Sequence, residues 1–196
     1  TLWQTLEHSE SRLLFVGKLD GWDHMKSGVP EGLPCISHPL APQDAQENNP
    51  RWDDIAASTA PLQGEPVRPG EELASIIYTS GTTGAPKGVM HSFAAFAWVV
   101  QTALKRVPLD GSTRMLSYLP LSHVVERALV EHGQLASGMH VYFADRLETF
   151  AADLQRARPT VFFSVPRLWV KFQHGVLAKI PAAKLDRLLQ LPIARG

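Results

Sequence analysis

The sequence predicts an α/β fold with a mainly parallel sheet and flanking helices. Two observations lead to this prediction. After Glu72, apolar runs of strand length alternate with single helical patterns, and strands joined by one helix usually pair in parallel through right-handed crossovers. Earlier in the chain, the run from Leu13 to Val16 is apolar at every position, as expected of a strand that is buried on both faces.

The N-terminal part is expected to begin with a helix that ends near Ser11, followed by that first strand and Gly17. Residues 20–70 differ in composition, because eight of the fifteen prolines lie there among Gly, Asn and Asp. Proline fixes φ and removes a backbone donor, which disfavours regular structure. We therefore predict a Pro-rich region, mostly surface loop, over residues 20–70, with one short helix over residues 52–58.

The rest of the chain has a regular order of elements. Candidate strands cover residues 73–78, 115–118, 140–143 and 160–163, and helical patterns cover residues 92–105, 123–136, 148–156, 166–179 and 182–189. Pro166 and Pro181 suit the first turn of a helix, where the missing N–H has no intrahelical partner. No internal repeat and no low-complexity tract interrupts this order.

Composition excludes several classes of protein. With 196 residues, 44% of them hydrophobic and 19% charged, the chain is long and apolar enough for a folded domain with its own core. Lys plus Arg equals Asp plus Glu at 19 each, so the basic surface of a nucleic-acid-binding protein is not expected. The longest apolar stretch, residues 93–100, is far shorter than a membrane span. The histidines are scattered singly, so no structural metal is expected.

The single cysteine, Cys35, cannot form an internal disulfide, and the start has no secretory signal pattern. A reducing cytoplasm is therefore the expected location.

The main candidate site is a Gly- and Thr-rich segment that follows the predicted strand ending at Tyr78. Glycine lacks a Cβ, so the backbone N–H groups of Gly81, Gly84 and Gly88 could approach anionic oxygens closely. The hydroxyl groups add hydrogen-bond donors, and Lys87 adds a compact positive charge for phosphate. The candidate phosphate-binding residues are Thr79, Ser80, Gly81, Thr82, Thr83, Gly84 and Lys87. Because a threonine hydroxyl can ligate Mg²⁺, Thr83 is the candidate metal ligand.

Two simpler interpretations compete for this segment. A Gly-rich surface turn would explain an isolated pair of glycines, but it explains the full string poorly. A Walker A loop would need glycine at Pro86 and serine or threonine at Gly88, so the segment is not a P-loop of that kind.

The string from Tyr78 to Val89, YTSGTTGAPKGV, is similar to the signature loop of the adenylate-forming superfamily of acyl-CoA synthetases, luciferases and adenylation domains. A second string, YLPLSHVVER from Tyr118 to Arg127, resembles the next family motif in the form typical of long-chain fatty acyl-CoA synthetases. The strings LEHS, LLFV and SVPRLW resemble the same subgroup. The resemblance implies that residues 1–196 are an incomplete portion of the large N-terminal AMP-binding domain.

The resemblance also places His123 beside the acyl and adenylate pocket, which makes it the candidate catalytic residue. The alternative is that His123 only begins the following helix. Glu126 falls in the first turn of that helix, where a carboxylate is favourable against the helix dipole. Arg127 and Arg167 are expected to be solvated helix charges, and Tyr78 and Trp169 to be core or pocket-wall residues.

The implied reaction has two halves. A fatty acid carboxylate attacks the α-phosphate of Mg-ATP to give acyl-AMP and pyrophosphate, and the thiol of coenzyme A then displaces AMP. ATP, Mg²⁺ and coenzyme A are therefore the expected cofactors and substrates of the whole protein. The loop would stabilise the charge that grows as pyrophosphate leaves.

Later motifs of the family do not occur in the sequence: the glutamate that binds Mg²⁺, the aspartate for ribose and the catalytic lysine of the small domain. We therefore expect a fragment that is inactive by itself. Two alternatives stay open, a nucleotide-binding fragment without turnover and adenylation of another carboxylate such as an amino acid. Surfaces that absent segments would cover are expected to cause self-association, and peripheral membrane contact of the whole protein also stays open.

Overall fold

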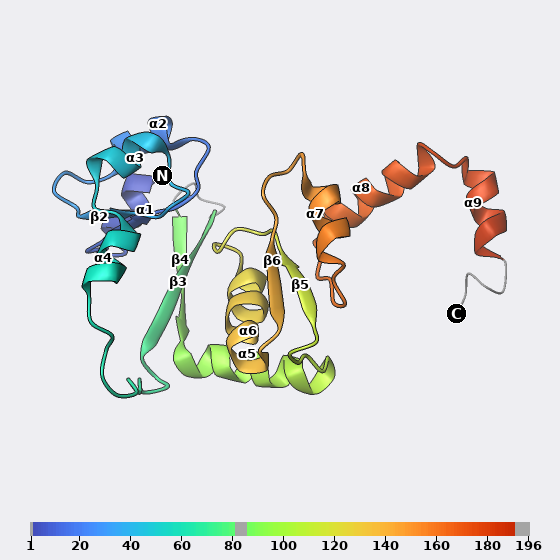
Figure 1. Ribbon diagram of the computed structural model, residues 1–196. Coiled ribbons are helices and arrows are strands. Elements are labelled where there is room, and N and C mark those ends of the chain that lie inside the picture. The colour runs from blue at the N-terminus through green and yellow to red at the C-terminus, as the bar shows by residue number, and fades with distance from the viewer. Residues whose placement is uncertain (1, 81–85, 191–196) are drawn as a thin grey trace. The chain divides into compact units, whose positions relative to one another are not determined.

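The computed structural model describes residues 2–80 and 86–190, without the side chains of Ser80, Ala182, Leu188 and Leu189 (Figure 1). The chain divides into two compact units. Unit 1 holds residues 1–108 and 119–136, and unit 2 holds residues 109–118 and 137–196. The described elements are helices and three two-stranded sheets, of which two are parallel and one is antiparallel. The predicted α/β class is confirmed.

Unit 1 begins with short elements around a parallel strand pair. Strand β1 (Leu14–Val16) pairs with β2 (Cys35–Ser37) in a register that places Phe15 beside Ile36. The other elements here are α1 (Leu2–His8), α2 (Trp22–Met25), the 3₁₀ helix η1 (Lys26–Gly28), α3 (Gln43–Asn48) and α4 (Trp52–Ser58). Helix α4 has the predicted bounds. Residues 20–70 thus hold more regular structure than their prolines indicated, including a strand that the sequence did not reveal.

A small core covers only one side of β1. Val16 is fully buried and packs with Trp22, Ala41 and Ala45. The neighbouring Phe15 points to the opposite face and is 47% exposed. The prediction that this strand is buried on both faces is therefore wrong within the described residues, because an apolar run shows which side chains can be buried and not what covers them.

The central part of unit 1 is a hairpin followed by a helix. Strand β3 (Leu73–Ser80) pairs antiparallel with β4 (Pro86–Ser92), and α5 (Phe93–Arg106) begins directly after β4. The Ser92 hydroxyl caps α5 by accepting a hydrogen bond from the N–H of Ala95 at 3.2 Å. The sequence predicts a strand, a loop and a helix here. The structure instead has a second strand, β4, between the loop and α5, and this strand pairs antiparallel with β3.

Unit 1 closes with a helical segment that packs on α5. It consists of a π-helix, η2 (Glu126–His132), and α6 (Gly133–Ser137), which overlap the predicted helix over residues 123–136. The rings of Phe96 and His132 stack with centroids 4.3 Å apart, and Phe96 shares a buried cluster with Ile77 and Ala128. This cluster joins the hairpin, α5 and η2.

Unit 2 is built on the parallel pair β5 (Arg114–Ser117) and β6 (His140–Phe143), in which Arg114 lies beside His140. Helices α7 (Phe150–Ala157), α8 (Pro166–Leu177) and α9 (Ala182–Leu189) follow β6. The bounds of β6 and α9 are those predicted. Residues 160–163, however, form no strand: the backbone N–H groups of Thr160 and Val161 both donate to the Arg114 carbonyl, and no ladder continues from there.

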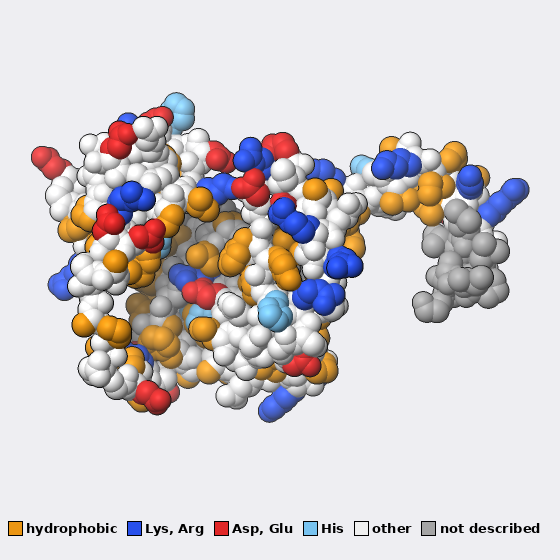
Figure 2. Space-filling view, viewed as in Figure 1, with side chains coloured by type: hydrophobic (Ala, Val, Ile, Leu, Met, Phe, Trp, Pro, Cys, Tyr) orange, Lys and Arg blue, Asp and Glu red, His pale blue; other side chains and the backbone are white. Residues whose placement is uncertain are grey.

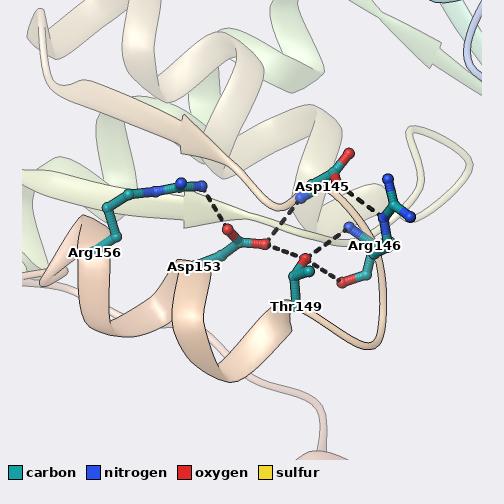
Figure 3. A network of polar contacts seen from close by, with 5 residues as sticks. All are labelled: Asp145, Arg146, Thr149, Asp153 and Arg156. Carbon is teal, nitrogen blue, oxygen red and sulfur yellow. Dashed lines mark hydrogen bonds and ion pairs between the residues drawn. The ribbon is translucent and has the colours of Figure 1, made fainter.

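A buried carboxylate connects β6 to α7 (Figure 3). Asp153, which is 4% exposed, accepts hydrogen bonds from the Thr149 hydroxyl at 2.8 Å and from the backbone N–H of Asp145 at 3.1 Å. Its other oxygen pairs with the Arg156 guanidinium at 2.6 Å. The Asp153 side chain therefore holds both ends of the loop that precedes α7.

Candidate functional site

The two strands of the β3–β4 hairpin bring the first and last candidate phosphate-binding residues together. Thr79 of β3 lies directly opposite Lys87 of β4, and Ser80 lies opposite Pro86. The Thr79 hydroxyl donates to the Lys87 carbonyl over 3.5 Å, a long contact that leaves the hydroxyl largely available. Lys87 and Thr79 are both exposed. The hairpin thus places one hydroxyl and one ammonium at the base of the predicted loop.

The middle of the predicted loop lies outside the described residues. This applies to four candidate phosphate-binding residues, Gly81, Thr82, Thr83 and Gly84, and therefore to the proposed metal ligand Thr83. The backbone bounds of β3 and β4 show only that five residues, 81–85, connect the two strands. Among the described residues, no group of three His, Cys, Asp or Glu side chains is placed to hold a metal ion.

Gly88 has a structural role that the sequence did not reveal. It lies within β4 opposite Tyr78 and not in the loop. A Cβ at this position would come within 2.7 Å of the Ile76 Cγ2 atom, closer than real Cβ atoms approach other groups, and within 3.3 Å of the Tyr78 ring. Glycine is therefore required here by packing inside the hairpin, which is a different reason from the close phosphate contact predicted.

The position of α5 limits how an anion can be held. The N-terminus of α5 follows Ser92, whereas the loop precedes Pro86 at the other end of β4. Six steps along a strand cover about 20 Å. The partial positive charge of a helix N-terminus acts only near the first turn, so the N-terminus of α5 is too far from Pro86 to stabilise an anion bound beside that residue. Loop N–H groups, hydroxyls and Lys87 would have to supply the positive potential.

An open groove of about 590 Å³ lies beside the base of the hairpin. Its described lining includes Tyr78 and contains no Lys, Arg, Asp or Glu. The Tyr78 hydroxyl is hydrogen-bonded to Nδ1 of His8 at 2.7 Å, and the two rings meet edge to face. No local pattern in the sequence indicates this pair, because the two residues are 70 positions apart and come from a helix and a strand. The lining residues are Leu2, Trp3, Thr5, His24, Met25, Ser27, Gly28, Tyr78, Thr79 and Pro86.

His123 begins the next helical segment of unit 1. Its carbonyl accepts hydrogen bonds from the N–H groups of Glu126 and Arg127, and its Nδ1 accepts one from the N–H of Val125 at 3.3 Å. This is the geometry of a helix N-cap, in which a side chain satisfies a free N–H of the first turn. The described hydrogen bonds of His123 are thus those of the structural alternative, and its catalytic role stays a prediction.

The neighbouring charged residues are placed within the same segment. Glu126 is buried at the first residue of η2, and Arg127 forms an ion pair with Glu131 at 3.0 Å, one turn later.

No described helix is long and apolar enough to cross a bilayer.

Comparison with known proteins identifies a family. The profile of the family described as AMP-binding enzyme matches residues 2–192. The chain is 35% identical over 156 residues to the human long-chain-fatty-acid–CoA ligase ACSBG2, which covers 74% of this chain and 23% of that protein. It is 33% identical over 141 residues to long-chain-fatty-acid–CoA ligase 1 of Schizosaccharomyces pombe, covering 68% of this chain and 21% of that protein. The chain therefore spans about a fifth of the length of these two relatives.

Solved structures support the same fold. A putative long-chain-fatty-acid CoA ligase from Rhodopseudomonas palustris matches with a TM-score of 0.66 and 21% identity, over 84% of this chain and 41% of that one. A red-emitting luciferase from Phrixothrix hirtus matches with a TM-score of 0.67 and 18% identity, over 85% of this chain and 34% of that one. At these identities the likeness concerns the fold alone.

Proposed function

Because the chain belongs to the AMP-binding enzyme family, we propose that it is part of an ATP-dependent acyl-CoA ligase that activates a fatty acid. In this proposal the whole protein converts the carboxylate and ATP to acyl-AMP and pyrophosphate, and coenzyme A then takes the acyl group. The names of the relatives, which are long-chain-fatty-acid CoA ligases, support a fatty acid as the substrate.

The observation that carries the proposal is the hairpin geometry. Antiparallel pairing holds Thr79 and Lys87 opposite each other at the two ends of the signature loop. A phosphate bound above them would meet the ammonium from one strand and the hydroxyl from the other. Such preorganised donors stabilise charge that develops on a leaving group, because they need no reorganisation during the reaction. The residues proposed to hold the phosphates are Thr79, Ser80, Gly81, Thr82, Thr83, Gly84 and Lys87.

Mg²⁺ is also proposed, as a companion of the nucleotide. Mg²⁺ prefers oxygen ligands, keeps several waters and is usually bound through one or two carboxylates plus substrate phosphates. The described base of the hairpin, Thr79 and Lys87, offers a hydroxyl oxygen but no carboxylate, so it fits a supporting position around a phosphate-bound ion and not a complete ion site. When bound, the ion would neutralise phosphate charge. The chain's own residues would orient the phosphates and stabilise the departing pyrophosphate.

Two other functions remain to be separated from this proposal. The second candidate, for this polypeptide alone, is a nucleotide-binding module without turnover. It is favoured because the chain covers only a small part of the length of its relatives. Adenylation of an amino acid or another carboxylate is the enzymatic alternative. The cytoplasmic location also stays a prediction.

Two measurements test the proposal. Fatty-acid-dependent exchange of pyrophosphate into ATP by the whole protein should be observed, and octanoate, palmitate and a set of amino acids should be compared as carboxylates. Calorimetric titration of the 196-residue chain with ATP should separately show whether the hairpin binds nucleotide. Exchange that depends on amino acids and not on fatty acids would contradict the proposed substrate. If the 196-residue chain binds ATP but catalyses no exchange by itself, this would favour the module without turnover for this polypeptide.

A further inference from the structure

Segment η2 of unit 1 is a π-helix that leads directly into α6. The N–H of Gly133 donates to the carbonyls of Ala128 and Val130, and the first of these lies five residues back, where an α-helix uses the carbonyl four residues back. π-Helical turns are rare and are frequent at functional sites. Because η2 begins three residues after His123, the contacts that hold η2 also determine how His123 is placed.

The side chain of His132 spans the same five-residue interval. Its Nδ1 atom lies 2.6 Å from the carbonyl oxygen of Arg127. A carbonyl oxygen can only accept a hydrogen bond, so Nδ1 carries the proton and donates it. The Arg127 N–H in turn donates to the His123 carbonyl at 3.2 Å. Two hydrogen bonds therefore connect the His132 ring to His123 through one intervening residue.

The same ring also packs on α5. The rings of His132 and Phe96 are nearly parallel, with an angle of 10° between their planes and centroids 4.3 Å apart. Phe96 is 3% exposed and shares its buried cluster with Ile77 of β3. Ile77 lies two residues before Thr79, at the base of the hairpin. His132 thus contacts both the segment that begins at His123 and the core beside the hairpin.

Burial alone does not select the π-helical register. The buried residues of η2 are Glu126, Ala128 and Val130, and residues two apart lie on roughly opposite sides of a helix. No single face of η2 is therefore buried. In the adjoining α6, Leu135 is 81% exposed, and Figure 2 shows other hydrophobic side chains, in orange, open to solvent. Specific contacts such as those of His132 are needed to fix the register.

We propose that His132 is a positioning residue, which holds η2 in its π-helical register and thereby sets the orientation of His123 relative to the hairpin. Without the Nδ1 donor, the segment would relax toward α-helical bonding and shift its register by one residue. One residue corresponds to a rotation of about 100° and a rise of about 1.5 Å. Misplacement of a reacting group by about 1 Å can lower a rate on the order of 100-fold. The inference rests on the proposed function only where it gives the position of His123 a catalytic consequence.

Two variants of the whole protein separate the contacts of His132. His132→Phe keeps a ring that can stack on Phe96 but removes the Nδ1 donor. His132→Asn removes the ring but keeps a donor on Cγ, at nearly the same distance from the backbone. The Phe variant should lower kcat of acyl-AMP formation about tenfold, and should change KM for ATP and the thioester half-reaction by less than about twofold. The Asn variant should recover most of this kcat.

Amide hydrogen exchange, measured by mass spectrometry, gives a readout that needs no substrate. In the Phe variant, the amides of residues 126–133 should exchange faster, whereas those of α5 should keep their protection. His174→Phe, at an exposed position of α8, is the control. It should change neither the amide exchange of η2 nor kcat.

Unchanged amide exchange in the Phe variant would overturn the proposal. Equal losses in the two half-reactions, equal losses in the Phe and Asn variants, or no loss in an active protein would also overturn it. A whole protein without fatty-acid-dependent exchange of pyrophosphate into ATP would contradict the proposed function. The amide exchange would still decide in that case whether His132 holds η2, so the two failures are distinct.

Discussion

The Thr149 hydroxyl donates a hydrogen bond of 2.8 Å to the Asp153 carboxylate, one turn further along the chain. This hydrogen bond is the largest cause that holds the pKa of the Asp153 carboxyl below its usual value. The hydrogen bond from the backbone N–H of Asp145 is the second largest. The carboxylate in turn orders the loop between β6 and α7, because its two oxygens reach the loop start, the loop end and Arg156.

The first prediction concerns acid stability. A carboxyl with a lower pKa in the folded than in the unfolded chain stabilises the fold above the unfolded value of about 3.9. This contribution is lost as the pH falls through the folded pKa. Asp153→Asn should therefore lower the melting temperature at neutral pH and reduce its fall below about pH 4, measured by thermal unfolding across pH. Asp186→Asn, on the exposed helix α9, is the control. If the melting temperature of the Asp153 variant fell with pH as it does in the unchanged chain, the pKa of Asp153 would not differ between the folded and unfolded states.

The second prediction concerns the hairpin. Gly88→Ala should destabilise the fold by about 1–3 kcal/mol, because the new Cβ would lie 2.7 Å from Ile76 and force β3 and β4 apart. Chemical denaturation measures the loss. Gly175→Ala, in α8, is a matched control, since a Cβ there would meet no other atom within 4 Å and alanine favours a helix. Equal stability of the Gly88 variant would mean that the hairpin adapts without cost.

The third prediction concerns Lys87 in the whole protein. If its ammonium interacts more strongly as pyrophosphate departs, Lys87→Ala should lower both kcat and kcat/KM for acyl-AMP formation. The expected loss of kcat is about 10- to 100-fold. This is smaller than the loss typical of a buried charge-stabilising donor, because water can partly replace an exposed ammonium. The melting temperature should be unchanged, and Lys105→Ala should affect neither quantity. Near-normal acyl-AMP formation with a large drop in melting temperature would make the hairpin base structural.

The fourth prediction separates the two roles of His123. His123→Ala in the whole protein should slow the adenylation half-reaction more than the thioester half-reaction, and should also cost about 1 kcal/mol through loss of the N-cap. His123→Asn restores a good cap, so it should recover stability without recovering the adenylation rate. Full recovery of both by asparagine, or equal loss in both half-reactions, would leave His123 with the structural role alone.

The fifth prediction concerns association of the 196-residue chain. Several described apolar side chains are exposed, as on the outer face of β1 at Phe15 and at Met90 of β4, and exposed apolar surface favours association. Sedimentation velocity should therefore show a mass that rises with concentration. A single monomeric species over the whole range would contradict this expectation.

Local patterns in the sequence determined most of the elements. The short helix at residues 52–58, strand β6 and helix α9 follow from apolar periodicity and turn residues, which act over a few positions. The segment proposed to bind phosphate was recognisable for the same reason, since its glycines, hydroxyls and lysine are contiguous. Family membership followed from this string.

Only the tertiary structure decided the features that depend on distant partners. Strand β4 was hidden because Pro86 and Gly88 disfavour a strand locally, whereas pairing with β3 compensates through seven register partners. The opposite error occurred at residues 160–163, whose β-branched and aromatic residues predicted a strand that finds no continuous ladder. His8 and Tyr78 meet across 70 positions, and Phe15 remains exposed beside the buried Val16. Side-chain chemistry sets what a residue can bury or bond, but the partner that satisfies it is supplied by the fold.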